Sequence, residues 1–407
     1  MNIPKSSTDI VIVGSGGYGR DYMKAIERIY PQGIASISAI VDPVRTQFEN
    51  YPGLTSSEIA HYSSLDDFLR SKHQADLVVI STPISYHAEQ SCALLRAGYN
   101  VLCEKPMAAT LAEAQQMRAI AEVSECFIEI GYQWSFSDAI QRLKADILGG
   151  RLGKPLRLKT RVAWPRASAY YQRNHWAGKI RDPKGRHVND SPINNAAAHY
   201  LHNMLYLTGP TIAQAATPIE ITGECYRANA IENFDAACCR IKTLEDVEIL
   251  FYAAHCVKNN DGPVFEFEFE HATVGLTQDG EIVAICANSE PINYGNPEAD
   301  PMCKLWHCIR RVQDIDAVGP LCGVDAAFAH TVCVYGMQQM PVHSFGEDQI
   351  RKMPLGDDGV LMYMEEMDNA MVTAFDTGKL FSELNLPWAS PSVSVELLNA
   401  QLPVSTL

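Results

Sequence analysis

The sequence has few of the features that mark membrane, secreted or nucleic-acid-binding proteins. No run approaches the roughly 20 apolar residues that a transmembrane helix needs, and the start, MNIPKSSTDIVIVG, lacks the apolar core of a signal peptide. Acidic residues (48) outnumber lysine and arginine (33), giving a formal net charge of −15, whereas nucleic acids and anionic membranes need a basic face. We therefore expect a cytoplasmic protein with neither a nucleic-acid nor a membrane partner.

The cysteines lack the spacing of a metal site. Twelve are present, but no two form a C-x-x-C pair. Several stand inside apolar runs, namely Cys92, Cys103, Cys238, Cys239 and Cys333. Such residues in a cytosolic protein are usually reduced and buried, so we predict no metal site and no disulfide. The chain also lacks an internal repeat, and its 407 residues predict two domains.

A glycine-rich loop follows the first strand-like run. Residues 9–13 are apolar and lead directly into GSGGYG, and a helical pattern comes next. Strand, glycine turn and helix in this order are the context that the dinucleotide-binding motif G-x-G-x-x-G requires, because the backbone can then approach a pyrophosphate at the helix N-terminus. The predicted cofactor contacts in this loop are Gly14, Gly16, Gly17, Tyr18 and Gly19.

An acidic residue ends the second apolar run. Residues 34–41 are followed by Asp42, which lies 23 residues after Gly19. An acid near this position binds the adenine ribose 2′-hydroxyl and repels a 2′-phosphate, so the sequence favours NAD over NADP. Arg45 is close enough to weaken that preference. The alternative is an ordinary turn acid before Pro43.

Two further motifs follow buried strands of the parallel type. Residues 77–80 and 101–103 are continuous apolar runs that alternate with helical patterns, and Thr110 to Glu113 has the form of a capping box. This predicts a doubly wound α/β domain whose ligands lie beyond the carboxyl ends of its strands. The residues at those ends are predicted cofactor contacts: Thr82, Pro83, His87, Glu104 and Lys105. Lys105 could also lower the pKa of a substrate hydroxyl; the alternative is a solvated loop lysine.

The second half of the chain predicts more strands. Strand-like runs occupy residues 156–164, 219–226, 236–241, 247–255 and 264–270, and the last of them, VFEFEFE, alternates strictly. We interpret it as a strand with one dry and one polar face, and the polar face is either without function or an oligomer contact. The tail from Pro387 is rich in proline and serine and predicts irregular structure.

A predicted helix over residues 194–208, closed by Gly209, carries an unusual polar stripe. Asn195, His199, His202 and Tyr206 stand at i, i+4, i+7 and i+11 and share one face. We favour a helix that faces a cofactor crevice. The alternatives are a solvent-facing stripe, satisfied core histidines, and a metal site that includes Asp190.

The segment before this helix, residues 164–190, is rich in tryptophan, tyrosine, arginine and asparagine. Long loops of this kind are often functional, and aromatic faces can stack on a sugar ring. The alternative is aromatic packing against the sheet. The arginines Arg161, Arg166, Arg173, Arg181 and Arg186 also permit an anionic sugar. The predicted substrate contacts are Trp134, Trp164, Arg166, Tyr171, Arg173, Asn174, Trp176, Asp190, Asn194 and His202.

Three segments together resemble the Gfo/Idh/MocA oxidoreductase family. They are GSGGYGR, STPISYHAEQSCALLRAGYNVLCEKPMAATLAEA and GYQWSF. The resemblance implies a Rossmann domain with a doubly wound parallel sheet (1–130), then an α/β domain with an open, mostly antiparallel sheet (131–386), before the tail (387–407). It also implies a nicotinamide cofactor, a sugar-like small-molecule substrate, and a homo-oligomer, either a dimer or a tetramer. By this resemblance Lys105 contacts the nicotinamide ribose and the substrate.

The chain departs from the family at its catalytic helix. The spacing from His199 to Gly209 matches the family's histidine, but Asn195 stands where members carry an aspartate. The usual acid–base pair is therefore incomplete, because an amide cannot accept a proton. His199 could act with Lys105 alone, Asp190 could supply a carboxylate, or hydride chemistry could be weak or absent. Our leading prediction is an NAD-dependent dehydrogenase or reductase with Lys105, His199 and Asn195 as catalytic residues; the rivals are transient-redox elimination and a non-catalytic NAD or sugar sensor.

Overall fold

The computed structural model describes residues 7–44, 59–287, 290–314 and 318–401. It divides into two compact units: the first contains Met1–Ser137 and Ala299–Ala327, and the second contains Asp138–Glu298 and Phe328–Leu407. None of the helices in the described ranges is long and apolar enough to cross a membrane. The observed units differ from the predicted domains in two places: residues 131–137 and the distant segment 299–327 belong to the first unit, whereas the prediction ended the first domain at residue 130.

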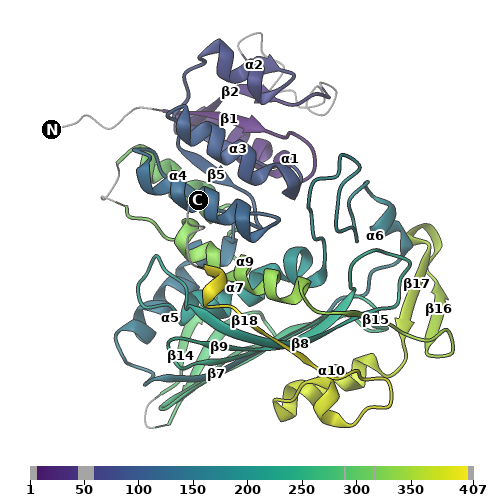
Figure 1. The fold of residues 1–407 in the computed structure, drawn as a ribbon. Helices are drawn as coiled ribbons and strands as arrows, with labels where there is room; N and C mark the ends of the chain where they lie inside the picture. The colour runs from purple at the N-terminus through teal and green to yellow at the C-terminus, as the bar shows by residue number, and fades with distance from the viewer. Residues whose placement is uncertain (1–6, 45–58, 288–289, 315–317, 402–407) are drawn as a thin grey trace. The chain divides into compact units, whose positions relative to one another are not determined.

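The first unit is built on a parallel sheet of the Rossmann type (Figure 1). In the described residues its six strands have the order β3-β2-β1-β4-β5-β6, and every neighbouring pair is parallel. The strands are β1 (Thr8–Val13), β2 (Ala35–Val41), β3 (Ala60–Tyr62), β4 (Leu77–Ile80), β5 (Val101–Cys103) and β6 (Ile128–Ile130). This order confirms the predicted doubly wound domain, and it brings the carboxyl ends of β1, β4 and β5 side by side.

Helices connect these strands, and local sequence sets their limits. They are α1 (Gly19–Ile29), α2 (Leu65–Ser71), α3 (Ile84–Arg96) and α4 (Leu111–Val123), with short 3-10 turns η1 (Tyr30–Gln32) and η4 (Gln133–Phe136). The predicted capping box is present, because the Thr110 side chain accepts from the Glu113 amide and the Glu113 carboxylate accepts from the Thr110 amide. Gly98, with φ +86, follows the last turn of α3.

The segment 299–327 completes the first unit. Its helix α8 (Cys303–Val312) buries Leu305, Cys308 and Ile309 in the same apolar cluster as β1 and α1. Glu129 of β6 is fully buried, and its carboxylate accepts from the Arg311 guanidinium and from the Cys322 amide at 2.8 Å. A charge buried in this way is tolerated because it is paired and hydrogen-bonded.

The second unit is built on a mostly antiparallel sheet, as the family resemblance implied. Among the described residues it has ten strands in the order β14-β13-β12-β11-β7-β10-β9-β8-β15, with β18 also paired to β8. They are β7 (Pro155–Ala163), β8 (Pro218–Arg227), β9 (Ala236–Thr243), β10 (Glu248–Ala254), β11 (Asp261–Phe269), β12 (Ala272–Leu276), β13 (Ile282–Cys286), β14 (Ile292–Gly295), β15 (Val342–Ser344) and β18 (Val393–Glu396). Only β7–β10 and β8–β15 are parallel in this part of the structure. All five predicted strands in this region are present.

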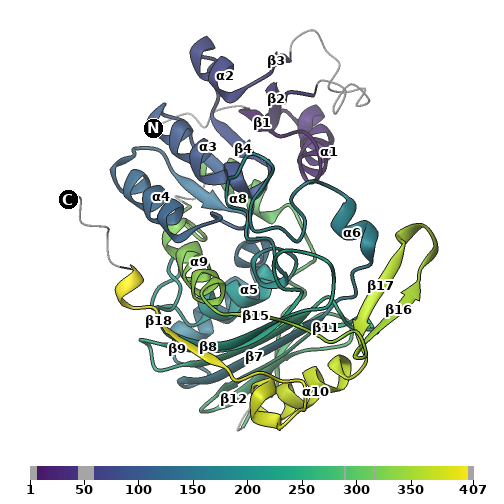
Figure 2. The same cartoon turned by 45° about the vertical axis from the view of Figure 1, so that its right-hand side comes forward.

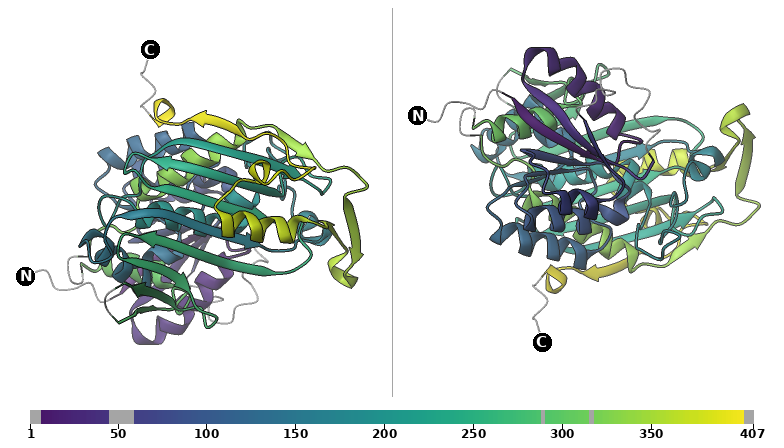
Figure 3. Two further views of the ribbon diagram at one scale, coloured as in Figure 1. Left: turned by 90° about the horizontal axis from the view of Figure 1, so that it is seen from below. Right: turned by 90° about the horizontal axis from the view of Figure 1, so that it is seen from above.

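Helices and a hairpin complete the second unit. The helices are α5 (Asp138–Leu148), α6 (Ser168–Gln172), α7 (Ala198–Leu207), α9 (Val324–Gln338) and α10 (Met367–Thr377), and α9 begins in the first unit. Strands β16 (Ile350–Pro354) and β17 (Val360–Met364) form the hairpin. The short turns are η5 (Pro192–Ala196), η7 (Gly356–Asp358), η8 (Phe381–Leu384) and η9 (Asn399–Gln401). Figure 2 shows the hairpin beside α6, and Figure 3 (left) shows α10 across one face of the sheet.

Strand β11 has the two predicted faces. Phe265, Phe267 and Phe269 are buried. Of the alternating glutamates, Glu266 and Glu268 are partly exposed and Glu270 is exposed. The polar face is paired within the sheet, because the Lys159 ammonium of β7 lies 2.6 Å from the Glu266 carboxylate. The cross-strand ion pair explains why glutamate is tolerated at these positions.

The C-terminal tail corrects the prediction of irregular structure. Val393–Glu396 forms β18 and pairs with β8 in antiparallel register. The segment alternates Val-Ser-Val-Glu, which is itself a strand signal. The proline- and serine-rich composition around it obscured that signal, and the open backbone edge of β8 supplies the hydrogen bonds.

Replacing Arg311 with methionine should destabilise the protein by about 3 kcal/mol, because it leaves the Glu129 carboxylate buried without its cation. Methionine keeps an apolar stem beside the Phe127 ring, over which the Arg311 guanidinium now lies. The shift of the denaturant midpoint, followed by circular dichroism, measures the change. The double variant Arg311→Met/Glu129→Gln should recover most of the loss, whereas Arg70→Ala, in an exposed pair with Asp67, should leave the midpoint near that of the wild type. Equal midpoints for Arg311→Met and the wild type would contradict this account.

Candidate functional site

The glycine loop between β1 and α1 is built for close backbone approach. Gly14 has φ +87, and a Cβ there would lie 2.9 Å from the Ser81 backbone. A Cβ on Gly19 would lie 2.1 Å from the Gly14 carbonyl oxygen. Gly17 is different: its φ is +50, but a Cβ would meet nothing within 4 Å. Gly14 and Gly19 are therefore required by the loop's own packing, whereas Gly17 borders open space.

Asp42 holds this loop from the end of β2. Its Oδ2 accepts from the Ser15 amide at 2.8 Å and from the Ser15 hydroxyl at 2.7 Å, and its Oδ1 accepts from the Val44 amide at 2.8 Å. The residue is 7% exposed. Asp42 is thus a structural acceptor as well as a predicted ribose ligand, and a carboxylate has further lone pairs for a hydroxyl donor. Arg45, named above as a complication, lies outside the described residues.

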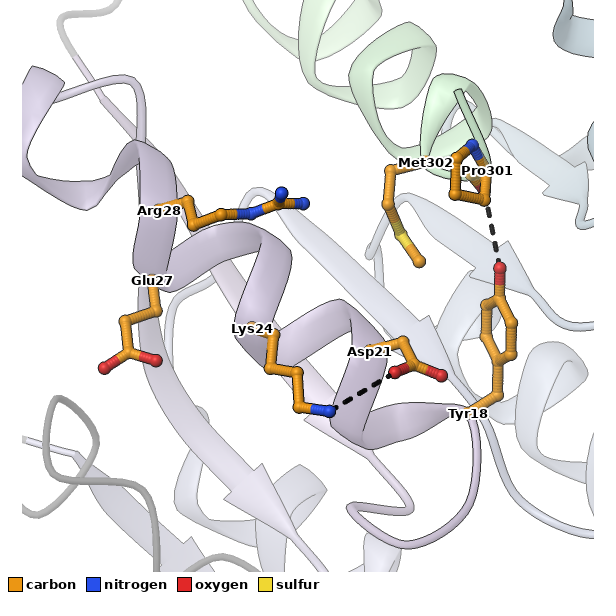
Figure 4. Close-up of a pocket in the computed structure, with 7 residues that line it drawn as sticks. All are labelled: Tyr18, Asp21, Lys24, Glu27, Arg28, Pro301 and Met302. Carbon is orange, nitrogen blue, oxygen red and sulfur yellow. Dashed lines mark hydrogen bonds and ion pairs between the residues drawn. The ribbon is translucent and has the colours of Figure 1, made fainter. Parts of the chain in front are cut away.

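The Tyr18 side chain serves the packing of the first unit. In Figure 4 its hydroxyl points at Pro301, and it donates to the Pro301 carbonyl at 3.4 Å. The ring makes an edge contact with Tyr22 (centroids 5.4 Å apart), and the Lys304 ammonium lies 4.4 Å from its centroid. Tyr18 also makes no side-chain cap at the start of α1. Its backbone, rather than its ring, is therefore the part suited to a cofactor. The pocket drawn in Figure 4 lies beside α1 and is lined by Tyr18, Asp21, Lys24, Glu27, Arg28, Pro301 and Met302.

Glu104, at the carboxyl end of β5, is the centre of a buried polar cluster. Its Oε1 accepts from the Tyr22 hydroxyl at 2.6 Å and forms an ion pair with the Lys304 ammonium, whose side chain is 1% exposed. Its Oε2 accepts from the Lys105 amide at 3.2 Å. Burial alone would raise the pKa of Glu104, but Lys304 and then Tyr22 lower it below its ordinary value. The carboxylate is therefore ionised and fixes the backbone that carries Lys105.

This assignment changes the predicted role of Glu104 from cofactor contact to structural anchor. Its two side-chain partners come from α1 and α8, and the sequence interpretation missed both. Tyr22 was visible only as a member of an apolar helix face. Lys304 lies 200 residues away along the chain, so no local pattern marks it.

His87 joins the two motifs at the strand ends. Its Nδ1 lies 2.7 Å from the Pro106 carbonyl oxygen and its Nε2 lies 2.9 Å from the Thr82 carbonyl oxygen. The residue is 1% exposed, and burial lowers its pKa despite the two carbonyl groups. The Thr82 hydroxyl is itself bonded to Gln90 at 2.6 Å, and Pro83 is the N-cap of α3. His87 thus positions the loops around Lys105, whose own side chain is partly exposed.

These features of the first unit fit a dinucleotide. The open side of Gly17 and the uncapped N-terminus of α1 suit a pyrophosphate, because the first turn of a helix leaves backbone N–H groups without intrahelical partners. Asp42 at the end of β2 suits the adenine ribose. Lys105 lies at the end of β5, two strands from β1 in the sheet order. Trp134, a predicted substrate contact, is 3% exposed in η4 and lies largely inside this unit.

In the second unit, the predicted helix over 194–208 is two elements. Pro192–Ala196 forms a π-helical turn, and the α-helix α7 begins at Ala198. Asn195 and His199 therefore do not share one continuous α-helix. Single π turns are rare and occur frequently at functional sites. The Ser191 hydroxyl caps this turn by accepting from the Asn194 amide at 3.2 Å.

The predicted polar stripe is divided by burial. Asn195 and His199 are partly exposed, whereas His202 (1%) and Tyr206 (0%) are buried. The His202 and Tyr206 rings stack, with centroids 5.7 Å apart, and Lys144 lies over Tyr206 at 3.5 Å. Burial lowers the pKa of His202 well below its ordinary value. His202 thus matches the alternative of a core histidine, which the sequence left open, rather than a substrate contact.

Asp190 is bonded to Asn195. Its Oδ1 accepts from the Asn195 Nδ2 at 2.7 Å, and its Oδ2 accepts from the Gly178 amide at 2.6 Å. This carboxylate orients the Asn195 amide, so that the Asn195 Oδ1 is the group it presents as an acceptor. The neighbouring Asn194 is 1% exposed and donates to the carbonyl groups of Val188 and Asn189. Asn194 thus serves the loop itself.

The loop before the π turn packs its aromatic residues together. The Trp164 indole donates to the Gly262 carbonyl at 3.0 Å and makes an edge contact with Tyr200, which follows His199. Tyr170 and Tyr171 make a similar contact. These interactions match the packing alternative for the tryptophan and tyrosine residues. They also place the loop along the N-terminal part of α7.

The other predicted substrate contacts differ in availability. Asn174 is engaged, since its Oδ1 accepts from the amides of Trp176 and Ala177 at 3.0 and 2.8 Å. Arg173 is exposed, and its guanidinium lies over the rings of Tyr170 and Trp176. The Tyr171 hydroxyl is buried and has no hydrogen-bond partner among the described residues. Burial raises the pKa of Tyr171 well above its ordinary value, so it remains a neutral donor.

Sequence comparison identifies the first unit. Residues 8–132 match the model of the GFO_IDH_MocA family, described as an oxidoreductase family with an NAD-binding Rossmann fold. The rhizopine catabolism protein MocA of Rhizobium meliloti is 28% identical over 208 residues, which are 51% of this chain and 59% of that protein. Inositol 2-dehydrogenase of Leifsonia xyli subsp. xyli is 31% identical over 147 residues, 36% of this chain and 42% of the enzyme. The chain thus spans about half the length of the curated relatives it matches.

Structural comparison extends the likeness in fold to both units. The WlbA dehydrogenase of Bordetella pertussis, solved with NADH and UDP-GlcNAcA, has a TM-score of 0.63 at 19% identity; the match covers 80% of this chain and 94% of that structure. Levoglucosan dehydrogenase, solved with NADH and L-sorbose, has a TM-score of 0.65 at 13% identity, with 80% and 94% coverage. The match of residues 8–132 to the family model confirms the resemblance to the Gfo/Idh/MocA family for the Rossmann domain, and the solved structures show that the fold of both units is shared.

Proposed function

We propose that the protein is an NAD-dependent oxidoreductase that oxidises a secondary hydroxyl group of a sugar, cyclitol or sugar acid, or reduces the corresponding ketone. The observation that carries this proposal is Lys105, whose backbone is anchored at the carboxyl end of β5 by the buried Glu104. The resemblance to the family supports it, since the relatives include inositol 2-dehydrogenases. When bound, NAD supplies the acceptor or donor of the hydride.

The first unit would hold the cofactor through its backbone and one carboxylate. The glycine loop and the N-terminus of α1 bind the pyrophosphate, and Asp42 accepts a hydrogen bond from the adenine ribose. A negative charge at Asp42 repels a 2′-phosphate, which favours NAD over NADP. His87 and Glu104 hold the loops around Lys105 without contacting the reacting atoms.

The proton of the substrate hydroxyl is handled by Lys105 and His199. The Lys105 ammonium stabilises the developing alkoxide, and the partly exposed His199 imidazole accepts the proton as the carbonyl forms. Asn195, oriented by Asp190, accepts a hydrogen bond from the substrate or from His199. In this scheme the Asn195 amide takes the position of the family's aspartate, and the Asp190 carboxylate holds that amide through a hydrogen bond. Asp190 is therefore a positioning residue.

Asp42→Asn should reduce the preference for NAD over NADP by about tenfold or more, because the amide keeps an acceptor for Ser15 but removes the charge that repels a 2′-phosphate. The ratio of kcat/KM with the two cofactors measures the preference; tenfold corresponds to about 1.4 kcal/mol. Ser15→Ala is the matched control, since it removes the hydroxyl bonded to Asp42 and keeps the carboxylate. It should weaken both cofactors alike. A ratio unchanged by Asp42→Asn would remove Asp42 from the cofactor site.

Lys105→Met and His199→Gln should each lower kcat by about 10²–10⁴-fold, the usual contribution of a general acid or base. NADH absorbance with a panel of sugars, cyclitols and uronates gives the rate. The exposed residues Lys72 and His271 provide controls, and Lys72→Met and His271→Gln should retain full activity. Near-normal turnover in both site variants would refute the assignment. Product released from a glycoside without accumulation of NADH would instead indicate transient oxidation followed by elimination.

Asn195→Asp should lower kcat at neutral pH by at least tenfold, although it recreates the family's residue. It places a second carboxylate within 2.7 Å of the Asp190 oxygen, and two carboxylates at that separation cannot both be ionised. The pH–rate profile of Asn195→Asp should therefore gain a titration above the range of an ordinary carboxyl group. The exchange variant Asp190→Asn/Asn195→Asp should recover much of the loss. If the single variant is as active as the wild type with an unchanged pH profile, the bond between Asp190 and Asn195 has no part in catalysis.

A further inference from the structure

The loop before the π turn carries more positive charge than its neighbours neutralise. Two arginines in or beside this loop have carboxylate partners. Arg161 forms an ion pair with Asp261, and Arg186 forms one with Asp182 at 3.1 Å. Arg181 is exposed and donates to the Gly185 carbonyl. Arg166 and Arg173 form no ion pair with a carboxylate anywhere in the described parts of the chain. In a protein of net charge −15, two neighbouring cations without a counter-ion need an explanation.

Both guanidinium groups converge on one aromatic ring. The Arg173 group lies 3.6 Å from the centroid of Tyr170, and the Arg166 group lies 5.0 Å from the same centroid and 5.7 Å from that of Trp164. A guanidinium stacked on a ring keeps its edge N–H donors for a planar or tetrahedral anion. Each makes one hydrogen bond to a nearby backbone carbonyl, that of Pro165 or Tyr170.

The Arg166 guanidinium has a donor without an acceptor, its Nε. It is buried and has no hydrogen-bond partner among the described residues. An unsatisfied buried donor on a charged group costs about 1–3 kcal/mol or more, and such a cost is normally removed by a partner. An anionic group of a ligand would supply the acceptor that this donor lacks.

The groups around Tyr170 give neither guanidinium an ion-pair partner among the described residues. His255 contacts the same cluster, and its ring lies 5.6 Å from that of Tyr170. Burial, and then Arg166, lowers the pKa of His255 to about 3, so it is neutral and adds no charge. Asp190 lines a small pocket with Tyr170 and His255, but its oxygens accept from Gly178 and Asn195. Asp190 therefore connects the loop to the π turn through these two hydrogen bonds.

We infer that Arg166 and Arg173 form a subsite for an anionic substituent of the substrate, a carboxylate or a phosphate. The inference rests on the proposed function and narrows it: the substrate is an acidic derivative of a sugar or cyclitol rather than a neutral polyol. The subsite adjoins the catalytic residues within the second unit, because Trp164 contacts Tyr200, next to His199, and Tyr170 shares a pocket with Asp190. Tyr170 is the platform that holds the two guanidinium groups.

The experiment compares matched substrates with the full-length protein. NADH formation is measured with glucose, glucuronate and glucose 6-phosphate, and with myo-inositol and its monophosphate. We expect kcat/KM to be at least tenfold higher for an acidic member than for its neutral parent. Arg166→Gln and Arg173→Gln should each reduce that ratio by about tenfold or more, and added salt should reduce it as well. Arg181→Gln, which removes an exposed arginine of the same loop, should leave the ratio unchanged.

The outcomes distinguish a failure of the anion subsite from a failure of the proposed oxidoreductase function. Turnover that favours a neutral polyol, or a ratio that neither arginine variant changes, overturns the anion subsite and leaves the oxidoreductase proposal standing. If no compound is oxidised or reduced, calorimetric titration with glucuronate and with glucose 6-phosphate decides. Binding of one of them that both variants lose supports the subsite and refutes hydride transfer as proposed, and the compound bound distinguishes carboxylate from phosphate. Absence of binding overturns the inference.

Discussion

The buried ion pair between Glu104 and Lys304 connects the parts of the first unit on which a cofactor site depends. Glu104 stands at the carboxyl end of β5, and its hydroxyl partner Tyr22 comes from α1, the helix after the glycine loop. Lys304 comes from the segment 299–327, which follows strands β7–β14 of the second unit in the sequence. An unpaired carboxylate at this depth would protonate or draw in water. Because it is paired, the backbone of Lys105 is fixed relative to α1.

A second polar arrangement, centred on the buried Asp190, holds the π turn that precedes His199. Asp190 accepts hydrogen bonds from both Gly178 and Asn195, so it connects the middle of the preceding loop to the π turn. A π turn strains the regular helix ladder, and it persists when neighbouring interactions stabilise it. The Asp190 carboxylate and the Ser191 cap provide such interactions. In the proposed function, the hydrogen-bonded Asn195 and Asp190 take the place of the single aspartate that the resemblance leads one to expect.

In the proposed function, the same loop connects the catalytic residues of the second unit to the anion subsite. Its tryptophan and tyrosine residues pack on one another and along α7, while two of its arginines are stacked on Tyr170 without carboxylates. Aromatic packing makes the loop rigid, and rigidity reduces the entropy lost when an anion is bound. An acidic protein that binds an acidic substrate needs such a local reversal of charge.

Local sequence determined the elements whose signals lie within about 15 residues. The strand–glycine–helix motif, the capping box at Thr110 and the alternation of β11 all reappear in the structure, because each depends on backbone geometry or on a single periodicity. The resemblance carried by the Glu104-Lys105 element predicted the family whose model residues 8–132 match. Only the tertiary structure decided the rest, since it depends on residues far apart in the chain: Lys304 beside Glu104, the return of 299–327 to the first unit, and β18 on the edge of β8. It also decided which polar residues of one helical stripe are buried, because periodicity defines a face but not what packs against it.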